Sequence, residues 1–186
     1  LGYRERSEFD FMVGSVHWIN GIMVDHDAGR LEQAARSCGG MEALCLAYYQ
    51  RVAEMVKALS PEVVGHLDLV RKFAPGEASV SSPRVREEAA RTLDVIAEAG
   101  CILDLNLAGL RKNLGRPYVA PWLIALAKER GVPFCFGDDS HCVGDVGAGH
   151  EAGRRYLLEY GVDSIMVLAR ESGGVIRREV SLEPSE

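Results

Sequence analysis

Apolar residues follow two different spacings along this chain. Continuous runs rich in Val, Ile, Leu and Phe are typical of strands that are buried on both faces. Four such runs occupy residues 8–17, 63–70, 101–106 and 132–136. Elsewhere apolar residues recur every three or four positions, which is the period of a helix with one buried face. Helices are therefore predicted over residues 41–60, 83–99, 121–130 and 152–160.

Residues at the ends of the predicted helices support these boundaries. Ser82 precedes Pro83, and a Ser followed by Pro at the first helical position favours a helix start. Gly100 and Gly131 follow two of the helices, and glycine readily adopts the left-handed conformation that ends a helix. Pro61 lacks the backbone N–H that would extend the first helix.

The C-terminal part of the chain has a pattern of its own. A strand over residues 164–169, a Ser-Gly-Gly turn and a strand over 175–182 predict a hairpin. Residues 18–30 and 109–112 carry glycines and charged residues and are predicted to be loops. The predicted order is strand–helix four times, followed by a strand pair. This order predicts an α/β fold with parallel strands covered by helices, as one domain over residues 1–186.

Composition and charge narrow the class of protein. The 186 residues are enough for one sizeable hydrophobic core. The net charge of −6 offers no basic surface to nucleic acid or to an anionic membrane. The apolar runs are shorter than the roughly 20 residues of a membrane-spanning helix. Five cysteines without a CxxC spacing favour a reducing compartment, which is the cytoplasm.

Polar side chains stand at or near the ends of the four predicted parallel strands. The carboxyl ends of such strands meet at one edge of the sheet, so these side chains are expected to cluster in space. If the last strand stays extended, its Asp and His point to the same side, because they are two residues apart. The residues are His17, His66 with Asp68, Asp104 with Asn106, and Asp139 with His141.

Structural roles remain open for several of these residues. A single His at a strand end is often a structural residue, and Asp139 with Ser140 is also a common helix N-cap pair. His26, in the first polar loop, is either a ligand or a solvated surface residue. Cys142 adjoins His141 and is either a ligand or a bystander.

The types of residue in the expected cluster suggest metal chemistry. Imidazole and carboxylate ligands suit Zn, Mn or Fe. Arg71 and Arg111 follow two of the strands, and arginine binds phosphate through two parallel hydrogen bonds. The sequence therefore predicts a metal-assisted hydrolase that acts on a phosphorylated small molecule.

Five short segments, taken together, resemble the polymerase-and-histidinol-phosphatase (PHP) superfamily, and within it the monofunctional histidinol phosphatases. The resemblance implies a distorted seven-stranded β/α barrel, of which this chain holds the C-terminal part. It also implies two or three divalent metal ions (Mn, Zn or Fe) and hydrolysis of L-histidinol phosphate. The segments are Gly14–His17, Gly65–Asp68, Leu103–Asn106, Ala108–Lys112 and Gly137–His141.

The resemblance also implies roles for individual residues. One metal would be bound by His17 and His66, a second by Asp139 and a third by His141. Of the remaining residues, the two arginines would bind the substrate phosphate, and Asp68 and Asn106 would either support the metal ligands or face the substrate. For Asp68 and Asn106 the alternative is capping of a helix or loop. These residues are Arg71, Arg111, Asp68 and Asn106.

The chain departs from the family pattern in two respects. Asp138 stands where the family usually has Ser or Thr. The family's His-x-His strand, a further His and a bridging Glu do not occur in this sequence, so part of a family-type site is expected to be missing. An open barrel would leave a sheet edge that could pair with a second copy of the chain. Two other hypotheses are a PHP-type phosphoesterase with another phosphate ester or a nucleotide as substrate, and a non-catalytic domain.

Overall fold

The computed structural model describes residues 9–112 and 114–183, so Glu8, where the first predicted strand begins, lies outside the described residues. Within them, the centre of the fold is a four-stranded sheet in the order β1-β4-β5-β6. Neighbouring strands of this sheet are parallel. The predicted α/β class is therefore confirmed. The strands are β1 (Val13–Gly14), β4 (Val63–Val64), β5 (Ile102–Asn106) and β6 (Phe134–Gly137).

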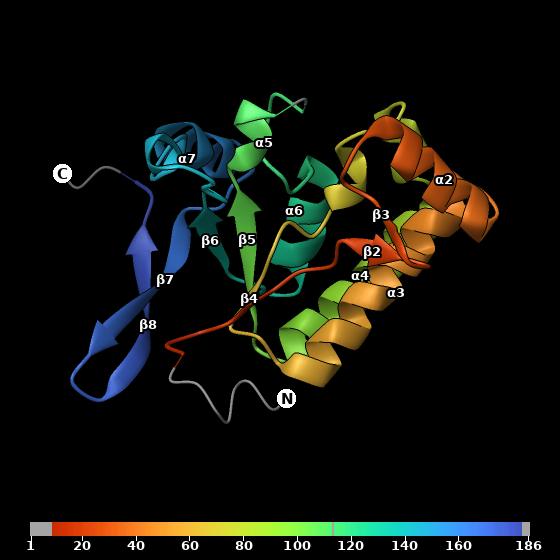
Figure 1. The fold of residues 1–186 in the computed structure, drawn as a ribbon. Coiled ribbons are helices and arrows are strands. Elements are labelled where there is room, and N and C mark those ends of the chain that lie inside the picture. The colour runs from red at the N-terminus through yellow and green to blue at the C-terminus, as the bar shows by residue number, and fades with distance from the viewer. Residues whose placement is uncertain (1–8, 113, 184–186) are drawn as a thin grey trace.

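The four predicted helices are present with nearly the predicted bounds. They are α3 (Met41–Leu59), α4 (Pro83–Glu98), α6 (Pro121–Glu129) and α7 (His150–Glu159). Figure 1 shows α3, α4 and α6 together on one side of the sheet, with α7 near the carboxyl ends of β5 and β6. The expected start of α4 is confirmed, because the Ser82 hydroxyl accepts a hydrogen bond from the Val85 backbone N–H at 3.4 Å.

Three elements replace the loop predicted over residues 18–30. They are the antiparallel strands β2 (Trp18–Ile19) and β3 (Ile22–Met23) and the helix α2 (Ala28–Cys38). Asp27 is the N-cap of this helix, and its carboxylate accepts a hydrogen bond from the Arg30 backbone N–H at 2.8 Å. Its buried face is Leu31, Ala34 and Ala35. The helix also has recognisable end signals, with Asp27 before its first residue and Gly39, in the left-handed conformation, after its last.

A short helix also replaces the loop predicted at 109–112. This helix, α5 (Ala108–Arg111), follows β5 directly. The side-chain oxygen of Asn106 accepts a hydrogen bond from the Ala108 backbone N–H at 3.1 Å. One such contact is enough to start a helical turn, and it cannot be recognised from apolar spacing.

The strand predicted over residues 63–70 is wrong beyond Val64. The chain turns at His66, which has a positive φ of 23°, and Leu69–Arg71 forms a 3-10 turn. Gly65 packs closely on the first strand segment, since a Cβ there would lie 2.3 Å from the Ser15 hydroxyl oxygen. The close approach and the left-handed turn end the strand and direct the His66 side chain.

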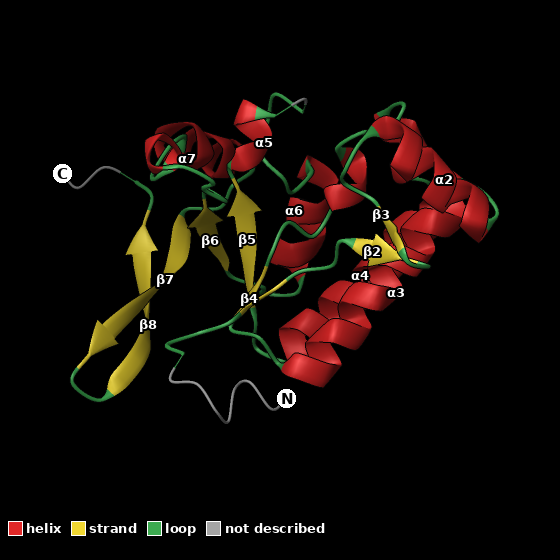
Figure 2. Cartoon of the chain, in the orientation of Figure 1, coloured by secondary structure: helices red, strands yellow, loops and turns green. Residues whose placement is uncertain are grey.

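The last two strands form the predicted hairpin. β7 (Ser164–Glu171) pairs antiparallel with β8 (Gly174–Ser181), and Glu171 is opposite Gly174 at the turn. β7 lies beside β6, and β8 projects away from the helical side of the molecule (Figure 2).

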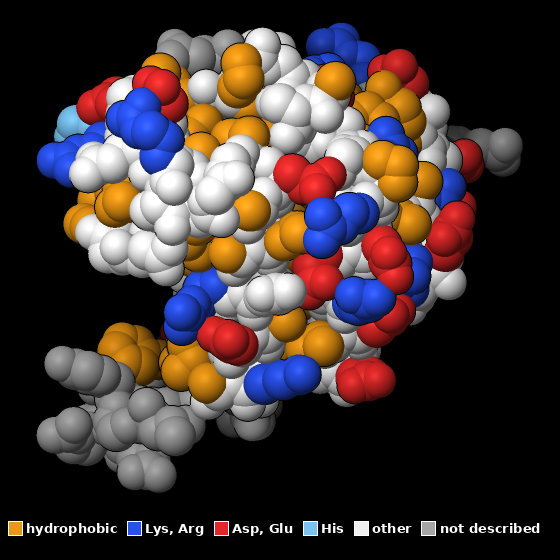
Figure 3. Space-filling model, turned by 90° about the vertical axis from the view of Figure 1, so that its right-hand side faces the viewer, with side chains coloured by type: hydrophobic (Ala, Val, Ile, Leu, Met, Phe, Trp, Pro, Cys, Tyr) orange, Lys and Arg blue, Asp and Glu red, His pale blue; other side chains and the backbone are white. Residues whose placement is uncertain are grey.

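The helical side of the molecule carries charges of both signs. Figure 3 shows acidic and basic side chains intermixed on this face. Arg84 of α4 pairs with Glu42 of α3 at 2.9 Å, and Arg91 pairs with Glu87 at 2.6 Å within α4. None of the helices in the described ranges is long and apolar enough to cross a membrane.

Candidate metal centre

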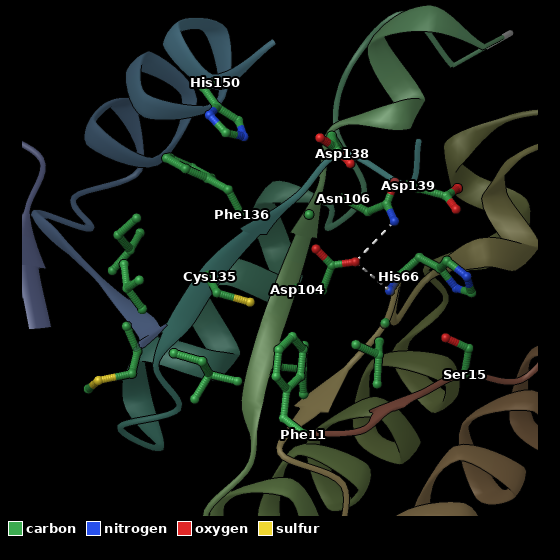
Figure 4. Close-up of a pocket in the computed structure, with 18 residues that line it drawn as sticks. Phe11, Ser15, His66, Asp104, Asn106, Cys135, Phe136, Asp138, Asp139 and His150 are labelled. Atoms are coloured by element: carbon green, nitrogen blue, oxygen red, sulfur yellow. Dashed lines mark hydrogen bonds between the residues drawn. The ribbon is translucent and has the colours of Figure 1, made fainter. Parts of the chain in front are cut away.

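A cleft of about 680 Å³ lies between the central sheet and β7. One part of its lining is apolar and includes Phe11, Val13, Cys135 and Val167. The other part is polar and lies at the carboxyl ends of the strands (Figure 4). The polar lining residues at these ends include His66, Asp104, Asn106, Asp138 and Asp139, and Ser15 and His150 also line the cleft. The structure therefore gathers polar ends from β4, β5 and β6, as the parallel arrangement predicts.

His17 and His66 lie against each other at the ends of β1 and β4. Their ring centroids are 4.9 Å apart, with the rings nearly perpendicular. His17 is half-exposed, and its Nδ1 lies 3.2 Å from Asp25 Oδ2. Burial, and then the nearby His17, lower the pKa of His66 to about 4, so its ring is neutral at pH 7. A neutral imidazole is the form that binds a metal ion.

Asp104 and Asn106 come from β5 and lie beside His66. The Oδ2 atom of Asp104 accepts hydrogen bonds from Asn106 Nδ2 at 3.0 Å and from the His66 backbone N–H at 3.4 Å. Burial raises the pKa of Asp104 to about 6. Asn106 lines the cleft, and its side-chain oxygen also accepts the hydrogen bond from the Ala108 backbone N–H at the start of α5. Asp104 was predicted to join the cluster of strand-end side chains, but no metal or substrate role was assigned to it.

Asp139 and His141 approach each other, but not because the strand continues. β6 ends at Gly137, and Asp139 has a positive φ of 48°. The Nε2 atom of His141 lies 3.4 Å from Asp139 Oδ1, and His141 is largely exposed. Lys112 Nζ lies 3.0 Å from the other carboxylate oxygen, Oδ2. The helix N-cap alternative for Asp139 does not hold, because α7 starts at His150.

The loop that carries these two residues is held by polar contacts. Asp138 accepts hydrogen bonds from the backbone N–H groups of Ser140 at 3.2 Å and Gly147 at 2.6 Å. The unusual carboxylate at this position therefore organises the loop. Arg111 donates to the Asp138 carbonyl at 2.7 Å, and its Nε lies 3.2 Å from Asp145 Oδ1. The structure thus places Arg111 as a bridge to the loop of Asp139.

Asp68 and Arg71 form a buried ion pair beneath the site. Both side chains are almost fully buried and hydrogen-bonded to each other. Asp68 Oδ2 also accepts from the Ala120 backbone N–H at 2.8 Å, and Arg71 Nε lies 3.3 Å from Glu77 Oε2. Neither residue is among those that line the cleft. Asp68 therefore supports the fold directly, and only part of the Arg71 guanidinium remains for a ligand.

Several buried polar atoms near the carboxyl ends of the strands have no hydrogen-bond partner. An unpartnered buried polar group costs about 1–3 kcal/mol, so native folds rarely keep many of them together unless a ligand or water satisfies them. Within the described residues they are Asp25 Oδ1, His66 Nδ1, Asp68 Oδ1, Arg71 Nε and Nη2, Asp104 Oδ1 and the Tyr118 hydroxyl.

These donors fit a divalent metal ion in their chemistry. A free imidazole nitrogen on His66 and free carboxylate oxygens on Asp25 and Asp104 are typical ligands of zinc, manganese or iron. The arrangement is incomplete, however. Across the part of the chain that the structure describes, no group of three or more His, Cys, Asp or Glu side chains is close enough to hold an ion. The chain supplies ligand pairs, and a metal ion would need further ligands.

Sequence reasoning did not assign three residues at this end of the sheet. Asp25 contacts His17, Lys112 contacts Asp139, and the Tyr118 ring lies 6.3 Å from the His66 ring. Their segments have no strand-end signal, because they reach the site through loops. The surface alternative holds for His26, which is exposed and 2.8 Å from Asp27. Cys142 is exposed, as expected for a bystander.

Comparison with curated proteins identifies histidinol phosphatases as relatives. The chain is 33% identical to the histidinol-phosphatase of Bacillus subtilis over 152 residues, which are 77% of this chain and 57% of that protein. It is 30% identical to the histidinol-phosphatase of Saccharomyces cerevisiae over 173 residues, 80% of this chain and 52% of that protein. The chain thus spans about half the length of the curated relatives it matches. No protein-family model matches the sequence.

Comparison with solved structures also finds histidinol phosphatases. A candidate histidinol phosphatase of Listeria monocytogenes superposes with a TM-score of 0.71 at 30% identity, covering 81% of this chain and 60% of that one. A histidinol phosphate phosphatase of Lactococcus lactis, solved with zinc, L-histidinol and phosphate, superposes with a TM-score of 0.64. It is 19% identical and covers 89% of this chain and 62% of its own. The predicted resemblance to histidinol phosphatases is confirmed over the shared region, and the fold is theirs.

Proposed function

We propose that this chain carries the C-terminal part of a PHP-type histidinol phosphatase, which hydrolyses L-histidinol phosphate to L-histidinol and phosphate. The proposal is carried by one observation, the gathering of His17, His66, Asp104 and Asp139 at the carboxyl ends of parallel strands. The similarity to two curated histidinol phosphatases supports the same activity. We infer a single domain over residues 1–186 that works with two or three divalent metal ions.

The proposed metal ligands are the two pairs found at the strand ends. His17 and His66 would hold one ion, while Asp139 and His141 would hold the others. The zinc in the Lactococcus lactis structure supports this kind of cofactor. A divalent ion at such a site would polarise a phosphoryl oxygen and lower the pKa of a water molecule bound beside it.

Other residues of the chain would position these ligands and the substrate. Asp25 would orient the His17 ring through its 3.2 Å contact. Asn106 would hold Asp104, and Arg111 would hold the loop of Asp139 and neutralise charge on the phosphate. Arg71 would bind the phosphate through its unpartnered Nη2 atom, with Asp68 holding the guanidinium in place.

A substrate panel tests the proposal. The complete gene product that carries this sequence is assayed with Mn²⁺ on L-histidinol phosphate, on other small phosphate esters and on a nucleotide 3′-phosphate. A clear preference for L-histidinol phosphate is expected. Equal rates on every ester would reject L-histidinol phosphate as the specific substrate. No phosphate release from any ester would favour the hypothesis of a non-catalytic domain.

We also propose a cellular location and a class of partners for the enzyme. We infer a cytoplasmic enzyme that uses a small-molecule phosphate ester and no nucleic acid or membrane. Association with a second copy through an open sheet edge remains a prediction, which the mass of the protein in solution would test.

A further inference from the structure

Each of the three residues from Tyr118 to Ala120 is hydrogen-bonded to another element: the end of β5, helix α7, and the loop after β4. The Tyr118 backbone N–H donates to the Asn106 carbonyl at 3.0 Å. The Val119 carbonyl accepts from the Tyr156 hydroxyl at 3.1 Å, and the Ala120 backbone N–H donates to Asp68 at 2.8 Å. The position of the Tyr118 side chain is therefore set by its backbone.

The Tyr118 side chain is buried, yet its polar end is not satisfied. Only 1% of the residue is exposed, and its hydroxyl has no hydrogen-bond partner among the described residues. Its ring lies edge-on to His66, with centroids 6.3 Å apart. A Phe in this place would fill nearly the same volume without a buried polar atom. The buried hydroxyl is therefore expected to form a hydrogen bond with a ligand or a water molecule.

A second donor without a partner belongs to the same region. Arg71 is buried, pairs with Asp68 and lies 3.3 Å from Glu77 through its Nε atom, and its Nη2 atom has no hydrogen-bond partner among the described residues. Two buried donors, one of them charged, fit an anion with several acceptor oxygens. The carboxylates of Asp68 and Glu77, which both pair with Arg71, oppose an anion. Phosphate binding here would therefore depend on the divalent metal ions of the proposed function.

We propose that the Tyr118 hydroxyl donates a hydrogen bond to a phosphate oxygen of the substrate, beside His66 and together with Arg71. This inference rests on the proposed function and adds a substrate-binding residue to it. An ordered water bound by Tyr118 alone is the competing occupant.

The test compares Tyr118→Phe with Tyr156→Phe in the complete gene product. Inorganic phosphate is titrated into the Mn²⁺-loaded protein by calorimetry, and thermal unfolding is recorded for each variant. Tyr118→Phe should weaken phosphate binding about 10- to 100-fold, the effect of one hydrogen bond to a charged group. It should not lower the unfolding midpoint of the phosphate-free protein, because the hydroxyl has no partner among the described residues. Tyr156→Phe should lower the midpoint, because its hydroxyl is bonded to Val119, and leave phosphate binding unchanged.

The outcomes separate this inference from the proposed function. If Tyr118→Phe binds phosphate as the unchanged protein does, or if the unchanged protein binds none, the inference is overturned. A lower unfolding midpoint with unaltered phosphate binding would assign the hydroxyl to a structural water. If phosphate binding weakens but L-histidinol phosphate is not the preferred ester, Tyr118 still binds phosphate and only the proposed substrate fails.

Discussion

The imidazole ring of His66 lies edge-on against that of His17, with the two ring centroids 4.9 Å apart. The residues are far apart in the sequence and come from the ends of β4 and β1, which pair directly in the sheet. Parallel pairing therefore brings the two candidate ligands together. The contact is the structural basis for the proposed metal site.

Loss of one of these rings should weaken metal binding. We expect His66→Ala to lower the affinity for Mn²⁺ by at least about tenfold, because even residues that only support metal ligands cost 10- to 100-fold. Calorimetric titration of the complete gene product with MnCl₂ measures this. His26→Ala is the matched control, since His26 is exposed and contacts Asp27. Equal affinity in the His66 variant would remove this residue from the site.

The buried pair of Asp68 and Arg71 should be sensitive to removal of one partner. Arg71→Met leaves a buried carboxylate without its counter-charge and should cost about 3–5 kcal/mol of unfolding free energy. Arg91→Met removes a surface pair with Glu87 and should cost less than about 1 kcal/mol. Urea unfolding compares the two variants. Similar losses in both would mean that the Asp68–Arg71 pair is not buried as described.

Gly137 should tolerate no side chain. A Cβ at this position would lie 2.2 Å from Asp104 Oδ1, and the Asp104 carboxylate is fixed by Asn106 and His66. Gly137→Ala should therefore cost about 1–3 kcal/mol, the usual range for overpacking. Gly173→Ala, in an open turn, is the control and should change little. Urea unfolding midpoints decide whether the two glycines differ.

Cysteine reactivity should report the buried face of α3. Burial, and then the nearby Glu42, raise the pKa of Cys45 to about 12, so its thiol stays protonated at pH 8. We expect iodoacetamide to label exposed Cys142 and not Cys45 in the folded protein, and both in urea. Labelling of the two at the same rate without urea would show that α3 is not packed.

The same pKa shift gives stability a pH dependence. The folded state holds the Cys45 proton more tightly than the unfolded state, whose thiol has its ordinary pKa of 9.0. This contribution to stability is complete below pH 9 and is lost as the pH rises from 9 towards 12. Cys45→Ala should therefore have a flatter alkaline stability curve, measured by urea unfolding.

The spacing of apolar residues and the residue types at helix ends predict most of the helices and the central strands. Both are local features of the sequence, so they can be recognised without knowledge of the tertiary contacts. The bounds of α4 follow from Ser82 and Pro83 and from a repeat of fully buried side chains. Helix α2 carries the same kind of signals, with Asp27 at its start and Gly39 after its end, and was missed although its sequence could have predicted it.

The site is predicted less completely, because contacts made through loops leave no trace in apolar spacing. His66 and Asp139 are found from their strand ends, but both residues adopt positive φ, and an extended strand was wrong there. Tyr118 reaches His66 only through tertiary pairing with the end of β5. The burial of Arg71 against Asp68 likewise depends on the packing of Ala120, which lies far away in sequence.

The most direct measurement is phosphate release from L-histidinol phosphate by the complete gene product, with chelator, with restored Mn²⁺ and in the variant Asp139→Asn. The account predicts that chelator abolishes release, that Mn²⁺ restores it, and that Asp139→Asn lowers the rate at least about 100-fold, because a metal supplies several kcal/mol of transition-state stabilisation. Release that survives chelator, or full activity in Asp139→Asn, would contradict a metal-dependent reaction at this end of the sheet.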